Sequence, residues 1–389
     1  MSVYNGERYL KKCIDSVLSQ SFINFEFLII NDASTDNTDH IISSYNDSRI
    51  RIIENSVNIG LTRSLNLGIK LSSANLIARI DADDYIAKDR LEKQYSFLKV
   101  NSDVGIVGSY MAIVDSSGKE LSICPVPSSA DILRWSCFFY TCIPHPTMMY
   151  HKSIIQKIGG YNENYKYAQD LDLLQQASLA MVKMANIREP LTFYRKHDEM
   201  ISSKNEQSQC EFANKIKAKN LSILLGKNVH SDSLDKIFRK EGEGLNEIRH
   251  LINLFFNHIK KEVYPYEPIF EDILKYLFSV KKDFLCEIID SIQGNYCLYG
   301  TGRFTEQLIT LLSDSKKKLP DYIVDLSCSK NSIGNIKFMD IRNYDGKLPV
   351  VLGSDSFQDE MRKKIKKYNK NTNINIIDLY NYGNFLNML

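Results

Sequence analysis

The chain has 389 residues, more than one typical domain holds, and its length suits two or three domains. Hydrophobic residues make up 43% and charged residues 25%, which is ordinary globular usage. The formal net charge is +2, so no basic footprint for nucleic acid is present, and no run of 18 apolar residues predicts a transmembrane span. The eight cysteines include no C-x-x-C pair, which favours reduced thiols in a cytoplasmic protein without a signal peptide.

Strand and helix patterns alternate along the first hundred residues. Apolar spacing predicts a strand tail at 2–4, a helix at 9–20, a strand at 25–30, a helix at 37–45, a strand at 49–54, a helix at 61–71, a strand at 76–80 and a helix at 90–99. A strand-rich stretch at 104–114 and a helix at 170–181 follow. This alternation is typical of a largely parallel sheet with helices on its faces.

The pattern changes near residue 202. Helical runs dominate up to about 292, and a new α/β pattern starts with a strand at 296–299. Further strands are predicted at 322–324 and 350–352, and a helix at 358–368. The predicted organisation is a first α/β domain at 1–205, a helical connector at 206–292 and a smaller α/β domain at 293–389.

Three carboxylates follow the predicted strand at 76–80, in the stretch Asp81-Ala82-Asp83-Asp84. Like charges this close repel one another, and one carboxyl tends to stay protonated unless a counter-charge is present. A divalent cation supplies that charge, and hard oxygen ligands suit Mg²⁺ or Mn²⁺. The stretch therefore predicts a metal–diphosphate site at the carboxyl end of a strand. The alternative is a solvated turn with an N-cap aspartate for the next helix.

By this point the first domain resembles the family 2 glycosyltransferases, which have the GT-A fold. The motifs that carry the resemblance stand in the family's order: Met1-Ser2-Val3-Tyr4-Asn5-Gly6-Glu7, Asn31-Asp32-Ala33-Ser34-Thr35-Asp36, Gly60 to Gly68, Asp81-Ala82-Asp83, His145-Pro146-Thr147, Gly159-Gly160-Tyr161, Gln169-Asp170-Leu171-Asp172 and Tyr194-Arg195-Lys196-His197. The resemblance covers roughly residues 1 to 200. The combination is more specific than any single motif.

The resemblance implies a role for individual residues. It implies that the nucleotide sugar contacts Val3, Tyr4, Glu7, Asp32, Asp81 and Ala82. It implies that Asp83 and His197 hold Mn²⁺ or Mg²⁺, and that Asp170 is the catalytic base. Three departures stand out: Leu65 where many members carry Arg, Gln169 where they carry Glu, and a first strand that looks clipped at its N-terminus.

Plainer explanations remain open for several of these residues. Asp170 could serve the dipole of the helix that it begins, and Asp32 could be an Asx-turn residue. His197 could be a surface or core histidine with no part in the site. His145, which lies between prolines 144 and 146, is expected to be positional rather than catalytic.

The tail carries Gly300-Thr301-Gly302-Arg303-Phe304-Thr305 between a strand and a helix, and Asp325 ends the next strand. This resembles a Rossmann fingerprint in which Thr305 takes the third glycine position. A scaffolding or partner role is favoured over ligand binding, because a fold does not fix a function.

The sequence thus predicts a metal-dependent, inverting glycosyltransferase with a GT-A domain, a helical connector and a Rossmann-like domain. Its expected donor is a nucleotide diphosphate sugar, UDP-linked, and its acceptor a saccharide or lipid-linked saccharide in bacterial surface polysaccharide synthesis. The expected place is the cytoplasm, with peripheral association at the inner face of the membrane and oligomers compatible with the sequence. The rivals are a non-catalytic sugar-nucleotide-binding scaffold and a nucleotidyltransferase, whose Gly-rich loop is missing from the N-terminus.

Overall fold

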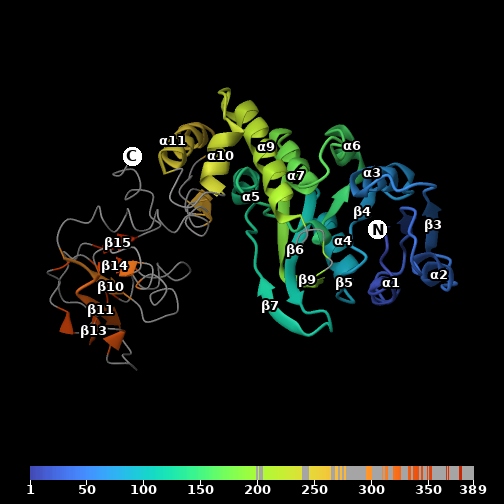
Figure 1. Ribbon diagram of the computed structural model, residues 1–389, viewed down its shortest axis with the longest axis horizontal. Helices are drawn as coiled ribbons and strands as arrows, with labels where there is room; N and C mark the ends of the chain where they lie inside the picture. The colour runs from blue at the N-terminus through green and yellow to red at the C-terminus, as the bar shows by residue number, and fades with distance from the viewer. Residues whose placement is uncertain are drawn as a thin grey trace. The chain divides into compact units, whose positions relative to one another are not determined.

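The computed structural model describes residues 1–198, 200, 205–238 and 245–263, and beyond them shorter stretches, chiefly 295–299, 319–325, 332–333, 336–340, 350–352 and 376–378. The chain divides into two compact units, Met1–Leu234 and Asp235–Leu389 (Figure 1), and each is described by itself. Among the residues described, none of the helices combines the length and the hydropathy that a membrane crossing requires.

The first unit begins with a three-stranded parallel sheet in the order β1-β2-β3. Its elements are β1 (Ser2–Val3), α1 (Leu10–Leu18), β2 (Phe27–Asn31), α2 (Thr38–Ser43), β3 (Ile50–Glu54) and α3 (Leu61–Leu71). Val3 pairs with Asn31, and Asn31 pairs with Glu54, so the carboxyl ends of all three strands meet at one edge. Open α/β sheets bind ligands at this edge.

Helix α1 packs its apolar face on this sheet. Leu10, Cys13, Ile14 and Val17 follow the i, i+3, i+4, i+7 spacing of an amphipathic helix, and all four are buried. They share a core cluster with residues of β1 and β2 and with two residues that follow β4: Val3, Phe27, Ile29, Ile80 and Ile86. This packing fixes the loop that carries Asp81 to Asp84 against the first sheet.

A second sheet in the same unit has the order β4-β8-β6-β9-β5, and β7 pairs with β6 beside it. Its strands are β4 (Leu76–Ala78), β5 (Tyr85–Ile86), β6 (Val104–Val114), β7 (Glu120–Cys124), β8 (Met149–His151) and β9 (Lys183–Arg195). The long strands β6 and β9 run parallel along each other (Figure 1), whereas β4–β8, β6–β8 and β5–β9 are antiparallel. The far end of β9 brings Arg195 and the residues after it to the loop that follows β4.

Helices surround this sheet. They are α4 (Arg90–Val100), α5 (Ala130–Ser136), the 3₁₀ turn η1 (His145–Thr147), α6 (Lys152–Lys157), α7 (Gln169–Leu179) and α9 (Glu206–Leu225). Helix α9 lies against α7 (Figure 1). The buried amide of Asn220 on α9 donates to Asp172 Oδ1 (3.1 Å) and Gln175 Oε1 (2.8 Å) on α7. Helix α10 (Ser231–Phe238) spans the division between the units.

The second unit contains α11 (Leu245–Glu262) and a six-stranded sheet in the order β12-β13-β11-β10-β14-β15. The strands are β10 (Cys297–Tyr299), β11 (Tyr322–Asp325), β12 (Ser332–Ile333), β13 (Ile336–Asp340), β14 (Val350–Leu352) and β15 (Ile376–Asp378). All pairs are parallel except β12–β13. The fingerprint at 300–305 and the helix predicted at 358–368 fall largely or wholly outside the described residues.

The predicted elements of the first hundred residues are confirmed to within about two residues at most ends, and α3 has the predicted bounds. The expectation of a largely parallel sheet is right for the first sheet and wrong for the second. Strand β4 was predicted, whereas β5 and β8 are only two and three residues long, too short to show a period in the sequence. The predicted domain boundaries near residues 205 and 293 stay predictions.

Candidate active site

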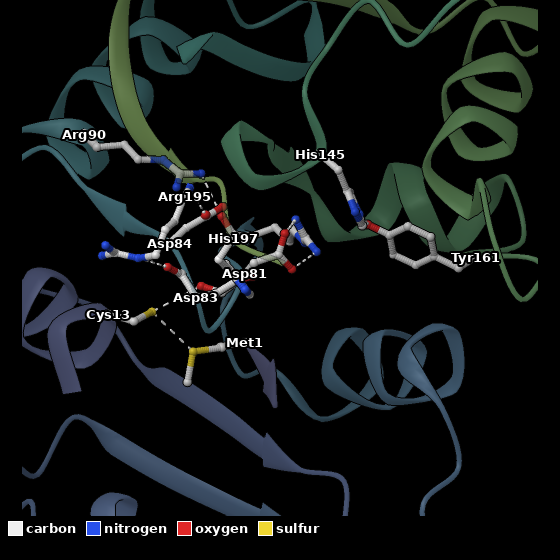
Figure 2. A network of polar contacts seen from close by, with 11 residues as sticks. Met1, Cys13, Asp81, Asp83, Asp84, Arg90, His145, Tyr161, Arg195 and His197 are labelled. Atoms are coloured by element: carbon white, nitrogen blue, oxygen red, sulfur yellow. Dashed lines mark hydrogen bonds and ion pairs between the residues drawn. The ribbon is translucent and has the colours of Figure 1, made fainter. Parts of the chain in front are cut away.

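Three carboxylates converge after β4. One ligand-capable oxygen from each of Asp81, Asp83 and Asp84 lies within 4.8 Å of the others (Figure 2). The chain turns sharply here, because the Asp84 N–H donates to the Asp81 carbonyl (3.3 Å). The Cys13 thiol of α1 donates to the same carbonyl (3.3 Å) and ties the turn to the first sheet. The predicted cluster of carboxylates is therefore present in space as well as in sequence.

Asp84 is the deepest member of the cluster, with 1% of its surface exposed. Burial raises the pKa of its carboxyl well above the ordinary 3.8, and repulsion from Asp83 and Asp81 adds to the shift. The backbone N–H of Arg195 donates to Asp84 Oδ1 (2.9 Å), while Oδ2 has no hydrogen-bond partner among the described residues. A buried oxygen without a partner beside two other carboxylates is an acceptor that suits a cation.

Asp81 has its own cation. Arg79, which is almost fully buried, donates to both carboxylate oxygens of Asp81. Burial raises the pKa of Asp81, and the attraction of Arg79 opposes that shift. Arg90 lies behind the pair and donates to the Arg79 carbonyl (2.8 Å); burial lowers its pKa to about 9. The ion pair turns Asp81 away from the role of a free metal ligand and leaves Asp83 and Asp84 to supply that charge.

Asp83 and His197 lie together, as the resemblance implies for a metal pair. His197 Nε2 is 3.0 Å from Asp83 Oδ2 (Figure 2), and the imidazole lies 4.8 Å, centroid to centroid, from the ring of Tyr9. The two residues are 114 positions apart in the chain. They meet because β9 runs the length of β6 and ends beside the carboxylate loop.

Arg195, which stands in the last of the motifs without an assigned role, is a structural residue of the site. Its Nε donates to the Asp83 carbonyl (3.0 Å), and its NH1 donates to the carbonyls of Asp115 (3.3 Å) and Ser116 (3.0 Å). Its guanidinium lies 4.6 Å from the centroid of Tyr9. Arg195 thus ties the carboxylate loop to the turn between β6 and β7. Arg79 could have been found from the sequence, because it lies in the apolar stretch predicted as a strand at 76–80 and a buried arginine needs a partner.

Asp170 lies in the first turn of α7, behind Ala168 in the left-handed conformation (φ 56°). Burial raises the pKa of its carboxyl, and bonds from nearby backbone N–H groups and the charge of Arg79 oppose the shift. The charge of Asp170 in turn contributes to the raised pKa of Asp81. Asp170 is therefore close enough to Asp81 for the two carboxylates to repel each other. Its neighbour Gln169 is buried, and Asp172 is held by Asn220.

His145 and Tyr161 form a second buried pair. His145 Nε2 and Tyr161 Oη are 2.8 Å apart (Figure 2). Burial lowers the pKa of His145 well below 6.5 and raises the pKa of Tyr161 well above 10.0, so both side chains are neutral near pH 7. A neutral pair with a satisfied hydrogen bond agrees with a positioning role for His145.

The residues expected at the nucleotide lie on the loops after β1 and β2. Asp32 is buried, and its carboxylate accepts bonds from Asn55 Nδ2 (2.7 Å), the Ile59 N–H (3.0 Å) and the Gly60 N–H (2.9 Å). Gly60 has a φ of 87°, which favours glycine and lets the chain enter α3. The three donors come from the segment that leads into α3, and they give Asp32 a structural role other than the Asx turn that was the alternative.

Some of the other residues expected to contact the nucleotide sugar are held by hydrogen bonds or buried, and others are exposed. Glu7 Oε2 accepts from the N–H and the Nδ2 of Asn37, both at 2.9 Å. Tyr4 is half-exposed, and Val3 is buried and accepts the Asp32 N–H (2.8 Å). Ala82 packs on the core of the first sheet. Tyr4 and Glu7 are the exposed members of this set, and Glu7 is already held by Asn37.

Comparison with known proteins assigns the chain to a family. The profile described as Glycosyl transferase family 2 matches residues 1–159. An uncharacterised glycosyltransferase of Haemophilus influenzae is 33% identical over 235 residues, 58% of this chain and 72% of its own. The O-antigen biosynthesis glycosyltransferase WbnJ of Escherichia coli is 30% identical over 205 residues, 51% of this chain and 79% of its own.

Among solved structures, S. aureus TarS 1–349 in complex with UDP gives a TM-score of 0.47 at 15% identity, with 81% of this chain and 86% of that chain covered. The family assignment rests on the sequence matches, which extend over more than two thirds of both named relatives. Strands β1 to β8 and the carboxylate loop lie within the residues that the profile matches, whereas β9, Asp170 and His197 lie beyond them. The chain belongs to glycosyl transferase family 2 and has a GT-A-like α/β fold in its first unit.

Proposed function

We propose that the protein transfers a sugar from a UDP-linked donor to a hydroxyl of a saccharide or lipid-linked saccharide, with inversion, in bacterial surface polysaccharide synthesis. The observation that carries the proposal is the cluster of carboxylates after β4, in which His197 from the end of β9 contacts Asp83 and one oxygen of Asp84 has no partner among the described residues. The Escherichia coli relative is named for O-antigen biosynthesis, which supports the proposed role in polysaccharide synthesis.

Mn²⁺ or Mg²⁺ fits the carboxylate cluster. The partnerless oxygen of Asp84 and the mutual repulsion of the carboxylates both favour a bound cation. Asp83 and His197 would hold it, with Asp84 beside them. When bound, the ion would neutralise the charge that develops on the leaving diphosphate. Asp81, already paired with Arg79, would face the ribose or diphosphate together with Ala82.

Asp170 is the proposed base. A neutral hydroxyl is a poor nucleophile, so a carboxylate must take its proton as it attacks the sugar. Burial moves the pKa of Asp170 upward, toward the range where a carboxylate is a more effective proton acceptor near neutral pH. One base opposite the leaving group is the arrangement that inverts the anomeric carbon in a single displacement, as in inverting glycosidases.

Nucleotide binding is assigned to the edge of the first sheet. Tyr4, Val3 and Glu7 would line the base, and Asp32 would accept a hydrogen bond from it. A carboxylate offers about four acceptor sites, so the three donors on Asp32 leave one for the base. Position 65 is a leucine and offers no positive charge to the diphosphate. The metal and Arg79 would therefore supply that charge.

The second unit is proposed as a Rossmann-like domain with a scaffolding role. Its parallel strands follow the order β13-β11-β10-β14-β15. The chain adds β11 and β13 on one side of β10 and then β14 and β15 on its other side, as in doubly wound sheets. Residues 206–292 are proposed as the connector. The proposed localisation is the cytoplasm, at the inner face of the membrane.

A panel of nucleotide sugars with Mn²⁺ tests the function. We expect slow hydrolysis of one UDP-sugar, seen as released UDP, and loss of that release in EDTA. Tight binding of a UDP-sugar without release of UDP, with or without a saccharide acceptor, would favour the non-catalytic scaffold instead. Binding of none of the panel would overturn both.

A further inference from the structure

An aromatic cluster joins α9 to the loop ahead of α7. Phe212 of α9 lies edge-on to two tyrosines of this loop: its ring centroid is 6.4 Å from that of Tyr165 and 5.8 Å from that of Tyr167, at interplanar angles of 84° and 72°. All three side chains are half-buried, so part of their surface is open to solvent. The hydroxyl of Tyr167 also donates to Oδ1 of Asn205 (3.0 Å), the residue before α9, which holds the loop against the helix.

Three exposed lysines surround these rings. Each ring has one ammonium at a cation–π distance: Lys166 Nζ is 5.4 Å from the centroid of Tyr167, Lys215 Nζ is 5.8 Å from that of Phe212, and Lys219 Nζ is 5.8 Å from that of Tyr165. The three members on α9 follow the i, i+3, i+7 spacing of one helix face. These six residues form the lysine–aromatic cluster.

The three lysines of the cluster have no carboxylate partner among the residues that the structure describes. An exposed lysine elsewhere, Lys183, pairs with an aspartate at 2.6 Å. Two glutamates close to the cluster in sequence have other partners: Glu163 lies 3.4 Å from Arg63, and Glu211 accepts from Gln207 (3.1 Å). In the described part of the chain, the cluster is therefore a patch of positive charge without a counter-charge.

The lysine–aromatic cluster lies beside the proposed base. A chain spans at most about 3.6 Å per residue, so the Cα atom of Tyr167 lies within about 11 Å of that of Asp170. The Tyr165 carbonyl accepts from the Thr62 hydroxyl of α3 (3.0 Å), and the Asn220 amide of α9 holds α7. The loop and the helix that carry the cluster are therefore fixed relative to Asp170. All six residues lie beyond residue 159, where the match to the family profile ends.

We propose that the acceptor is a saccharide that carries phosphate, and that the lysine–aromatic cluster binds it beside Asp170. This inference rests on the proposed function, because Asp170 marks the acceptor side of the site only if it is the base. The lysines would bind the phosphate. The half-buried rings would pack against the apolar faces of the sugar, as aromatic side chains do in ligand sites that hold a few polar groups in place.

Lysine side chains favour phosphate over carboxylate as the anion. An ammonium is a point charge with three donors and adapts to a tetrahedral phosphate, whereas the planar carboxylate is matched best by the fork of an arginine, which the cluster lacks. An ammonium that moves from a ring face to a phosphate exchanges a weak cation–π contact for a charge-assisted hydrogen bond. The same movement exposes the ring to the sugar.

Binding of small sugar phosphates to the full chain tests the proposal without requiring sugar transfer. The probes are the 1-phosphates of glucose, galactose, N-acetylglucosamine and N-acetylgalactosamine, each compared with the methyl glycoside of the same sugar. Saturating UDP and Mn²⁺ fill the donor site, and saturation-transfer NMR titrations give the dissociation constants. We expect at least one 1-phosphate to bind about tenfold or more tighter than its methyl glycoside. A salt concentration of about 1 M, which screens charges beyond about 3 Å, should abolish this advantage.

A lysine variant and its matched control locate the bound phosphate. The variant replaces all three lysines of the cluster and should remove the advantage of the 1-phosphate: Lys166→Gln, Lys215→Gln and Lys219→Gln. The control removes the same number of exposed charges elsewhere and should keep the advantage: Lys88→Gln, Lys99→Gln and Lys183→Gln.

A second pair of variants tests the rings. Tyr165→Leu removes one ring of the cluster and should weaken binding of the 1-phosphate and of the methyl glycoside alike. Tyr95→Leu removes an exposed ring from α4 and should weaken neither.

Two further probes distinguish the sources of the phosphate. The sugar whose 1-phosphate binds is linked through a diphosphate to citronellol in one probe and through a phosphodiester to glycerol in the other. Tighter binding of the first supports a lipid-linked acceptor, and tighter binding of the second supports a phosphate-bearing polymer.

Four results would overturn the proposal: equal binding of the 1-phosphates and the methyl glycosides, no binding of any probe, an advantage that persists in the lysine variant, or a loss of UDP affinity in that variant, which would place the lysines at the donor. A folding failure of Tyr165→Leu leaves the lysine variants, which alter only exposed side chains, to decide. Release of UDP from the panel of nucleotide sugars reports the proposed function separately. Binding of a 1-phosphate without any release of UDP would therefore count against the function and not against the phosphate site.

Discussion

Two carboxylate regions at the ends of neighbouring sheets differ in how their oxygens are satisfied. Asp32, after β2, accepts three hydrogen bonds from the segment that leads into α3. Asp83 and Asp84, after β4, lie among other carboxylates, and one oxygen of Asp84 has no partner in the part of the chain that the structure describes. In the sequence both are aspartates at the end of an apolar strand.

This difference distinguishes a carboxylate that holds a loop in place from carboxylates that bind a cation. Donors that converge on a carboxylate stabilise a loop, and the carboxylate then contributes mainly to the fold. Carboxylates that converge on one another destabilise the unliganded protein and contribute to stability only when a cation joins them. We therefore expect substitutions after β4 to abolish function with little cost in stability, and the substitution after β2 to cost stability first.

The largest expected effect follows from Asp83→Ala. Removal of this carboxylate takes away a proposed metal ligand and a partner of His197, so sugar transfer should fall below detection. Changes to groups that merely support a metal ligand cost 10–100-fold in affinity, and loss of a ligand should weaken Mn²⁺ binding by at least about 100-fold. Calorimetric titration with Mn²⁺ measures the affinity.

Asp103→Ala is the matched control. Asp103 is an exposed carboxylate paired with Lys183, away from the loop after β4, and its loss should alter neither Mn²⁺ affinity nor turnover. The melting temperature of Asp83→Ala should equal or exceed that of the native chain, because repulsion is relieved. A large fall in melting temperature with Mn²⁺ affinity preserved would show that Asp83 anchors the loop as Asp32 does.

Asp170→Asn should have the next largest effect. It keeps the shape of the side chain and removes the proton acceptor, so kcat should fall by ~10²–10⁴-fold with little change in the affinity for the donor. Burial raises the pKa of Asp170, and only its ionised form is a base. Activity of the native chain should therefore decline as the pH falls through that raised pKa, above the ordinary 3.8.

The residual activity of Asp170→Asn should lack this acidic decline. A pH–rate profile of both proteins over the acidic range, with the donor affinity measured at each pH, gives the comparison. An unchanged acidic limb in the variant, or a fall in donor affinity instead of kcat, would place the base elsewhere.

Asp32→Asn should have the smallest of these three effects. The amide has one acceptor oxygen and turns an NH₂ toward backbone donors, so the N–H groups of Ile59 and Gly60 are poorly satisfied. Unfavourable burial of such groups costs about 1–3 kcal/mol, and the free energy of unfolding should fall by that amount. Urea unfolding measures it, and UDP titration of the same variant reports the proposed contact to the base.

Stability unchanged within about 0.5 kcal/mol would contradict the anchoring role of Asp32 and leave the base contact as its only duty. Asp103→Ala is also a suitable control for UDP binding, because Asp103 is paired with Lys183 and lies on neither nucleotide loop.

The elements of the first unit that could be predicted are those with a long, uninterrupted apolar pattern. Helices such as α1 and α3 show two or three turns of apolar spacing, and β2 and β3 have five residues, so all were found. Strand β9 was missed as a strand of 13 residues, because polar residues interrupt it near Asn186 and Arg188. The antiparallel pairs of the second sheet depend on contacts between distant residues, which no local pattern encodes.

The candidate site was predictable in part for the same reason. The motif order located Asp83 and His197, and the structure brings these two together. The ion pair of Arg79 with Asp81 and the ties of Arg195 depend on backbone carbonyls and burial, which a motif does not describe.

The last prediction asks whether both carboxylate regions behave in the same way without the second unit. A chain ending at residue 238 keeps α9, whose Asn220 amide holds Asp172 and Gln175 on α7, the helix of Asp170. It should bind UDP and Mn²⁺ within about twofold of the full chain, because every residue of both regions precedes residue 200 and twofold is well under 1 kcal/mol. A chain ending at residue 205, the predicted boundary, removes Asn220 and leaves buried acceptors on α7 unpaired, so it should melt at a markedly lower temperature. Equal melting temperatures for the two shortened chains would show that α9 does not support α7, and loss of UDP binding in the folded 238-residue chain would show that the second unit completes the site.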